Sequence, residues 1–216
     1  MTQELIAGRS GHAAPSPAVA FKDIAFAKYA RQCAHAVNEA GAVEERIAAL
    51  TNEFARNWSM PDKRFLQLQA NAPYASYLLY LSESSNLSIV LDIFMAGQEA
   101  VAHNHLCWCV FCCLEGVERE RLLKVPHDLS APPLSIESRL RYPGEVTTAG
   151  SGAEDFHEVE CADSYRAVSL HIYGADIGRI ERKMWNSELK RYESFRSGYS
   201  NDLLNLPPYL APRDLA

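Results

Sequence analysis

The residues of this chain with the richest chemistry gather in one short stretch. Residues 97–116, GQEAVAHNHLCWCVFCCLEG, hold two histidines, four cysteines and a glycine at each end. Imidazole nitrogens and thiolate sulfurs are ligands for transition metals, and paired thiols can form disulfides. Three interpretations are therefore open for this stretch: a metal site, a disulfide framework, or an apolar segment of the core.

The cysteines favour reduced thiols over a disulfide framework. Four of them lie within an apolar, strand-like run of seven residues, where near neighbours cannot easily bridge to one another. Residues 1–20 lack the basic start and apolar core of a secretory signal, so we expect a cytoplasmic protein. No repeated CxxC pair has the spacing of a zinc ribbon. We expect three of the cysteines to be small buried hydrophobic residues: Cys107, Cys112 and Cys113.

Composition and charge exclude several classes of function. The chain has 216 residues, is 48% hydrophobic and carries a formal net charge of −6. No block of Lys and Arg stands out, so nucleic acid and membrane are not expected as partners. No apolar run reaches the ~20 residues of a membrane span. A chain of this length can bury a core without a metal, so any metal is expected to be functional.

Two kinds of element must position the histidines and cysteines. Residues 21–57 place apolar residues at helical spacing with a break at Gly41, which predicts two helices. After residue 74, short β-type runs alternate with turn-like clusters, a pattern typical of an antiparallel sandwich or barrel. We expect strands at residues 77–81, 87–94, 106–114, 117–125, 135–142, 155–161 and 166–174.

The alternation of side chains along a strand brings chemically useful residues to common faces. The sets that would share a face are His103, His105, Cys107 and Cys109; His157 and Cys161; and Ser169, His171 and Tyr173. If these faces line one barrel, several imidazoles converge inside it. Neutral imidazoles close together are good ligands for Fe(II), Zn or Cu.

The spacing of these residues resembles that of a known family. This stretch resembles the first cupin motif. The matching positions are Gly97, His103-Asn104-His105, Cys109 and Gly116. A cysteine stands where that motif usually has glutamate, as in cysteine dioxygenases of the animal type. A degenerate second motif, GSGAEDFHEVEC, keeps one histidine. The segments SLHIYGADIG and SGYSN resemble the Ser-x-His-x-Tyr segment and C-terminal signature of the thiol dioxygenases, especially the bacterial 3-mercaptopropionate dioxygenases.

The resemblance covers residues 75–201 and implies a fold. That fold is a mainly β cupin barrel, a double-stranded β-helix or jelly roll, with N-terminal α-helices. The expected organisation is a flexible leader at 1–20, a helical segment at 21–74 packed on the barrel, the barrel at 75–201 and a tail at 202–216. The oligomeric state stays open, and a monomer is compatible with the sequence.

The resemblance also implies an activity and its residues. The family uses O2 to oxidise a small thiol to its sulfinate at a non-haem Fe(2+) ion. The residues that match its three iron ligands are His103, His105 and His157. The residues that match its hydrogen-bonded relay beside substrate and oxygen are Ser169, His171 and Tyr173. Cys109 and Tyr173 match the pair that forms a thioether crosslink in animal-type enzymes.

The sequence matches only one of the two substrate contacts that the resemblance implies. Arg182 matches an arginine that helps to hold the substrate carboxylate in the bacterial enzymes. A second polar contact of the family is expected near Ala75, which cannot make it. Arg64, Gln67 and Gln69 are the nearby polar residues that could replace it.

Two other functions remain open at this point. The loss of a polar contact near Ala75 would suit an iron oxygenase that cleaves a ring or a carbon–carbon bond in a non-thiol substrate. A non-catalytic, metal-binding cupin is the second alternative, but a passive binder has no need of an ordered Ser-His-Tyr set. His103, His105 and His157 could also be core histidines, and Arg182 a surface residue.

Overall fold

The computed structural model of the chain describes residues 23–68, 72–82, 84–150 and 155–211, so the leader expected at 1–20 lies outside the described part. The helical pair expected on either side of Gly41 is confirmed as α1 (Ile24–Val37) and α2 (Val43–Ala55). Asp23 caps α1 by accepting a hydrogen bond of 2.9 Å from the Phe26 amide. Gly41 lies in the intervening turn with a φ of +101°, a conformation that favours glycine.

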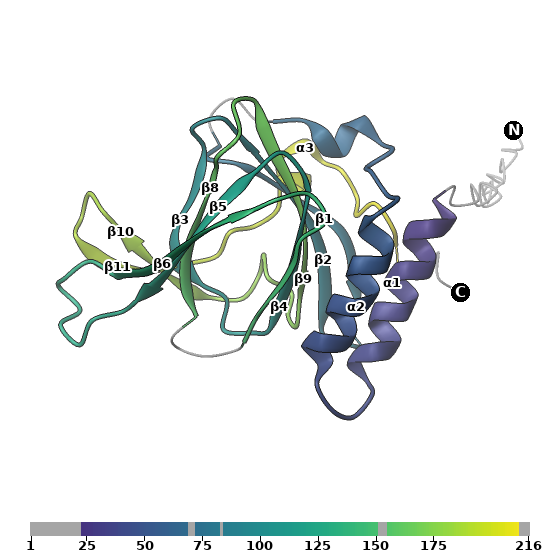
Figure 1. Ribbon diagram of the computed structural model, residues 1–216, viewed down its shortest axis with the longest axis horizontal. Coiled ribbons are helices and arrows are strands. Elements are labelled where there is room, and N and C mark those ends of the chain that lie inside the picture. The colour runs from purple at the N-terminus through teal and green to yellow at the C-terminus, as the bar shows by residue number, and fades with distance from the viewer. Residues whose placement is uncertain (1–22, 69–71, 83, 151–154, 212–216) are drawn as a thin grey trace, which may run out of the picture.

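The described residues contain eleven strands in two antiparallel sheets that face each other as a barrel (Figure 1). The sheet orders are β1-β2-β9-β4-β7 and β11-β10-β3-β8-β5-β6. From β2 to β10 the chain crosses repeatedly from one sheet to the other, which is jelly-roll connectivity. The expected mainly β barrel is confirmed. The strands are β1 (Ala75–Ser82), β2 (Leu87–Met95), β3 (Glu99–Asn104), β4 (Cys109–Glu115), β5 (Glu118–Lys124), β6 (Leu134–Arg141), β7 (Val146–Ala149), β8 (Phe156–Cys161), β9 (Arg166–Tyr173), β10 (Arg182–Asn186) and β11 (Arg191–Phe195).

The two long helices cover the outer face of the five-stranded sheet (Figure 1). Outward residues of that sheet, such as Leu91 and Leu170, share one hydrophobic core with residues of α1 and α2. The next residue along each strand points into the barrel, as Asp92 and His171 do. The alternation therefore separates an apolar core outside the sheet from a polar barrel interior.

The expectation that His103, His105, Cys107 and Cys109 share one strand is wrong. β3 ends at Asn104 and β4 begins at Cys109, so the strand expected at 106–114 starts three residues late. Leu106, with a φ of +58°, lies in the turn between them. The apolar run has the composition of a strand, but its first residues carry the chain from one sheet to the other.

The sequence analysis did not predict several of the charged or short strands. These are β7 and the β10–β11 hairpin, which projects from the barrel (Figure 1), whereas β3 was expected only as the strand that carries His103. A short helix, α3 (Ser200–Leu204), and a 3-10 turn, η1 (Lys63–Leu66), were not expected either. Beyond α3 the chain returns to the barrel, where Leu210 is buried and its amide donates to the Leu79 carbonyl at 2.8 Å.

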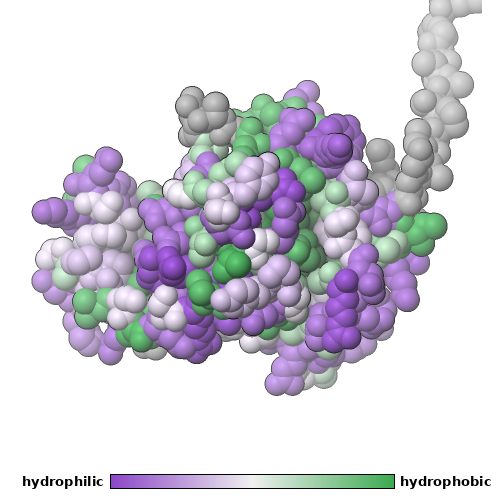
Figure 2. All heavy atoms as spheres, turned by 45° about the horizontal axis from the view of Figure 1, so that its top comes forward, coloured by the Kyte–Doolittle hydropathy of each residue, from purple (hydrophilic) through white to green (hydrophobic). Residues whose placement is uncertain are grey.

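The surface view from the α3 side shows hydrophilic and hydrophobic residues interspersed over that face (Figure 2). Among the helices within the described residues, none has the length and apolar character needed to cross a bilayer.

Candidate metal centre

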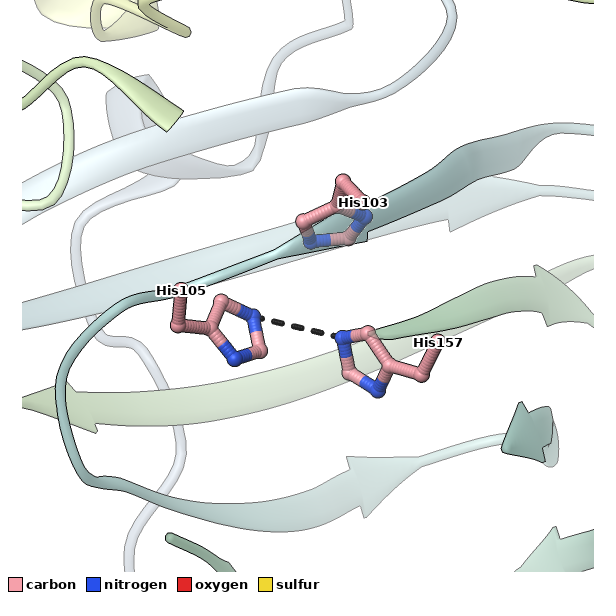
Figure 3. Close-up of side chains that lie close together, drawn as sticks. All are labelled: His103, His105 and His157. Carbon is pink, nitrogen blue, oxygen red and sulfur yellow. Dashed lines mark hydrogen bonds between the residues drawn. The ribbon is translucent and has the colours of Figure 1, made fainter. Parts of the chain in front are cut away.

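Three histidines meet inside the barrel because two antiparallel strands hold them in register. His103 of β3 is the direct partner of His157 of β8. His105 follows β3 immediately, at the start of the turn to β4. One ligand atom from each ring lies within 4.8 Å of the others, and all three residues are buried (Figure 3). The structure thus brings together the three histidines that the sequence singled out.

The Nδ1 atom of each ring faces an acceptor. His103 Nδ1 lies 2.7 Å from the Val101 carbonyl oxygen. His105 Nδ1 lies 3.1 Å from Asp155 Oδ2, and His157 Nδ1 lies 3.0 Å from Glu120 Oε1. A carbonyl or an ionised carboxylate can only accept, so each Nδ1 carries the proton. In a neutral ring with this tautomer, Nε2 is the unprotonated nitrogen and its lone pair is free.

The free lone pairs face one another. Nε2 of His105 and Nε2 of His157 are 3.2 Å apart, the contact drawn as a dashed line in Figure 3. With both Nδ1 atoms protonated, neither Nε2 has a proton to donate to the other. Two facing lone pairs repel unless a cation lies between them. A divalent metal ion bound by the three Nε2 atoms would turn this repulsion into coordination.

The surroundings of His103 and His105 favour neutral rings, as metal ligands must be. Burial, followed by the charge of the neighbouring imidazoles, lowers the pKa of His103 and His105 well below the usual value. Of the two carboxyl groups that accept from the histidines, Glu120 is the one whose pKa is lowered. Burial raises its pKa, but the hydrogen bonds from His157 and Arg141 outweigh burial and lower the pKa to about 2. Glu120 is therefore ionised at neutral pH and orients His157.

The donor set fits a catalytic transition-metal site. Three neutral nitrogens leave the full charge of a divalent ion in place and leave coordination positions for other ligands. Iron, zinc and copper all accept imidazole, so the histidines alone do not select one of them. Among the described residues, no other group of His, Cys, Asp and Glu has its ligand atoms this close together.

A hydrogen-bonded chain on β9 runs alongside the three histidines. Ser169 Oγ lies 2.8 Å from His171 Nε2, and His171 Nδ1 lies 3.0 Å from the Tyr173 hydroxyl. All three residues are buried. The Tyr173 ring centre lies 5.3 Å from that of His105, which brings the phenol to the edge of the histidine cluster. The chain can hold the Tyr173 hydroxyl in one orientation and pass a proton along β9.

Cys109 lies beside this relay. In the pairing of β4 with β9, Cys109 is the direct partner of Tyr173, and both are buried. The geometry places the two residues of the possible crosslink opposite each other. The remaining cysteines of β4, Cys112 and Cys113, and Cys107 before the strand, are buried free thiols outside the histidine cluster.

Arg182 of β10 is buried in the wall of the same cavity. Its Nη1 donates to the Asn104 carbonyl at 3.3 Å, and its Nη2 donates to Ser197 Oγ at 2.8 Å. The guanidinium lies over the Phe195 ring, 4.5 Å from its centre. The Nε atom has no hydrogen-bond partner in the described part of the chain. Arg182 is thus held in place with donors to spare for an anionic ligand.

The cavity continues into an open cleft. Next to His103, a cleft of about 420 Å³ is bounded by β3, the β10–β11 hairpin and the start of α3. The cleft and the inner cavity share Tyr74, Ser76 and Ser197 in their walls. Most of the cleft wall is apolar, including Met184 of β10. The cleft therefore reaches His103, one member of the histidine cluster.

The sequence analysis placed the wrong residue of β1 at the site. Ala75 points outward into the core beneath the helices, whereas Ser76 lines the cavity. Because side chains alternate along a strand, an error of one position reverses the face. Of the proposed replacements, Arg64 and Gln67 lie outside the cavity wall, and Gln69 lies outside the described residues.

The acidic residues around the site were also missed. Glu120, Asp155 and Asp92 come from β5, from the residue before β8 and from β2. Asp92 is buried with Oδ2 3.6 Å from His171 Nε2. A signal did exist, because an acidic residue inside an apolar strand run such as LSIVLDIF is unusual.

The chain is similar to several solved structures at low sequence identity. No protein-family model matches the sequence. A cupin superfamily protein from Desulfitobacterium hafniense is 16% identical, with 56% of this chain and 93% of that chain covered and a TM-score of 0.40. A cupin 2 conserved barrel domain protein from Rhodopseudomonas palustris is 11% identical, with 56% and 75% covered and a TM-score of 0.41. A structure of oxalate oxidase is 14% identical, with 54% and 59% covered and a TM-score of 0.40.

Proposed function

We propose that the chain is a mononuclear non-haem iron(II) dioxygenase that oxidises a small carboxylate-bearing thiol to its sulfinate. The observation that carries the proposal is the convergence of three unprotonated Nε2 atoms beside an ordered Ser-His-Tyr chain. A metal site alone would need only the histidines. The relay adds a group that can donate or accept a proton beside the metal position, which suits catalysis.

The overall reaction needs no co-reactant other than oxygen. A thiol, R–SH, and O2 combine to R–SO2H, with both oxygen atoms placed on sulfur and no external reductant. Iron(II) held by His103, His105 and His157 would supply positions for a thiolate and O2 together with the electrons that activate O2.

The protein groups have separate tasks in this reaction. The Tyr173 hydroxyl, held by His171, is placed to hydrogen-bond to oxygen or substrate at the metal position. Arg182 offers its spare donors to the substrate carboxylate.

A non-thiol substrate is the second candidate. The observation in its favour is the apolar cleft of about 420 Å³ beside His103, which offers room for a ring. An oxygenase that cleaves carbon–carbon bonds would use the same three histidines. A thiol would then fail to bind at the metal, which makes the two candidates separable.

Oxygen uptake by the iron-loaded protein tests the proposal directly. The panel is cysteine, 3-mercaptopropionate, cysteamine and mercaptosuccinate, with product mass recorded in the same samples and metal-free protein as control. We expect uptake with at least one thiol and a product heavier by two oxygen atoms. If iron-loaded protein consumes no oxygen with any thiol, the thiol substrate is rejected and the non-thiol substrate becomes the proposal.

A further inference from the structure

The strand β6 forms an open edge of the six-stranded sheet. Among the described residues it pairs with β5 alone, so every second residue turns its backbone N–H and C=O groups away from the sheet. β7, in the other sheet, does not pair with this edge, and a cleft of about 330 Å³ is lined by residues of both strands. An uncovered strand edge is a template for pairing with another strand.

The side chains of β6 are unusual for a strand edge that faces water. Leu134, Ile136 and Leu140 are 58%, 65% and 41% exposed. Proteins commonly protect an open edge with proline or with charges that repel a second strand. β6 contains no proline, and its two exposed charged residues, Glu137 and Arg139, have opposite signs and form an ion pair with each other. Exposed apolar residues and balanced charges favour pairing instead of preventing it.

The order of residues on β6 is complementary to itself. Consider two antiparallel copies of the strand related by a two-fold axis at Ser138. Ile136 of each copy then lies opposite Leu140 of the other, and Glu137 lies opposite Arg139. A shift of the register by two residues would set Glu137 against Glu137 or Arg139 against Arg139, and like charges opposite each other are destabilising. The sequence of the strand therefore favours one register.

We infer that β6 is a dimerisation edge, which pairs antiparallel with β6 of a second copy of this chain and joins the two six-stranded sheets across a two-fold axis at Ser138. A second copy fits better than an unrelated partner, because the apolar and the charged positions of the strand both match the strand itself. The inference does not depend on the proposed reaction, since none of the three histidines lies on β6.

Sedimentation equilibrium of the full-length protein measures the association. We expect a reversible equilibrium between the 24.1 kDa chain and a dimer of twice that mass. Glu137→Arg sets an arginine opposite Arg139 at two symmetric positions, so the dissociation constant of the dimer should rise at least ~10-fold. Arg139→Glu should have the same effect. Glu53→Arg makes the same change of charge at an exposed position of α2, and this matched control should leave the dissociation constant unchanged.

The double variant, Glu137→Arg with Arg139→Glu, tests the register. It exchanges the two charges and so restores opposite signs at both symmetric contacts. We expect its dissociation constant to return to within about 3-fold of the wild-type value, because residues in direct contact are energetically coupled.

Ser138→Cys gives a second measurement that does not depend on charge. At the two-fold axis the two introduced thiols face each other, and direct partners on antiparallel strands have Cα atoms about 4.5–5.5 Å apart, within the range of a disulfide. The six natural cysteines are buried, so a disulfide-linked dimer formed under mild oxidation reports the introduced thiol. Ser194→Cys, at an exposed position of β11, is the matched control and should form much less of the linked dimer.

Three results would overturn the inference. The first is a monomer at every protein concentration up to roughly 200 μM, since a specific interface holds at such concentrations. The second is a dimer whose dissociation constant is the same in wild type and in both single variants, because that dimer would use another surface. The third is a double variant as weak as the single variants, together with no more linked dimer from Ser138→Cys than from Ser194→Cys.

Discussion

The three histidines can act as metal ligands because other groups accept hydrogen bonds from their Nδ1 atoms. Val101, Asp155 and Glu120 each accept from one Nδ1, and this fixes the tautomer that turns Nε2 toward the centre. The spacing His-x-His and the later histidine were visible in the sequence. Their acceptors were not, because each acceptor is set by strand register rather than by spacing along the chain.

Glu120→Gln tests this support at the residue scale. A neutral amide holds His157 less firmly and stabilises the metal-bound imidazole less, so iron(II) affinity should fall roughly 10- to 100-fold. Chelator competition measures the affinity. Glu158→Gln is the matched control, since Glu158 lies on β8 but pairs with Arg121 on the barrel surface. Equal affinity in wild type and Glu120→Gln would show that Glu120 has no part in metal binding.

Tyr173→Phe tests the relay. The substitution keeps the ring and removes the hydroxyl that His171 holds at 3.0 Å. We expect kcat for thiol oxidation to fall on the order of 100-fold while iron content stays at the wild-type level. A loss of bound iron with little change in kcat per iron would assign Tyr173 to packing around His105 instead.

At the element scale, β5 carries two buried carboxyl groups whose pKa values are shifted in opposite directions. Glu120 is paired with His157 and Arg141. Glu118, two residues earlier, is fully buried, and neither of its oxygens has a hydrogen-bond partner among the described residues. Burial raises the pKa of Glu118 from its usual 4.5 to about 7.

The raised pKa of Glu118 predicts a pH dependence of stability. Between pH 4.5 and 7 the folded state keeps a proton that the unfolded state releases, so stability falls as pH rises through this window. The contribution amounts to roughly 3 kcal/mol at pH 8. Glu118→Gln removes the titration, so its unfolding free energy relative to wild type should increase by about that amount from pH 4.5 to pH 8. Urea denaturation at both pH values measures the difference, and parallel pH profiles would contradict it.

Gly116, at the turn between β4 and β5, shows how the motif glycines position the relay. Its φ is +73°, and an added Cβ would lie 2.0 Å from the backbone oxygen of Arg166, at the start of β9. Gly144 also has a positive φ, +88°, but a Cβ there would meet nothing within 4 Å. Both glycines avoid backbone strain, and only Gly116 also avoids a clash with the strand that carries Ser169, His171 and Tyr173.

The two glycines give a matched pair of variants. Gly144→Ala should cost about 1 kcal/mol of unfolding free energy through backbone strain alone. Gly116→Ala should cost at least about 2 kcal/mol more, because β9 must shift to admit the methyl group. Chemical denaturation of both variants compares the costs. Similar losses of unfolding free energy in the two variants would mean that the close approach of Gly116 to β9 does not affect stability.

The elements that the sequence predicted are those with strong local patterns. The helices on either side of Gly41 and the apolar strands β2 and β9 were expected close to their observed bounds. The β10–β11 hairpin was missed because it projects from the barrel and carries charged residues on its exposed faces. The break between β3 and β4 was missed because apolar residues fill the turn, and only the change of sheet shows that a turn is needed.

At the scale of the whole molecule, the barrel interior is unusually acidic for a buried space. Glu120 and Asp155 contact the histidine cluster, Asp92 lines the same cavity, and Glu118 is buried near the charges of Asp92 and Glu120. The guanidinium groups in the same region belong to Arg141 and Arg182. The helices seal the outer face of one sheet, so these charges cannot be screened by water from that side. A divalent cation at the histidine cluster would offset the excess of negative charge.

Iron(II) binding at equilibrium is the most direct test of this account. Full-length protein and the variants His103→Ala, His105→Ala and His157→Ala are dialysed anaerobically against limiting iron with a competing chelator, and iron per chain is measured. We expect one tightly held iron per wild-type chain and a loss of at least ~100-fold in affinity in each variant, because every Nε2 is a ligand. A wild type that holds no iron, or variants that keep their iron as well as the wild type, would contradict the three-histidine centre.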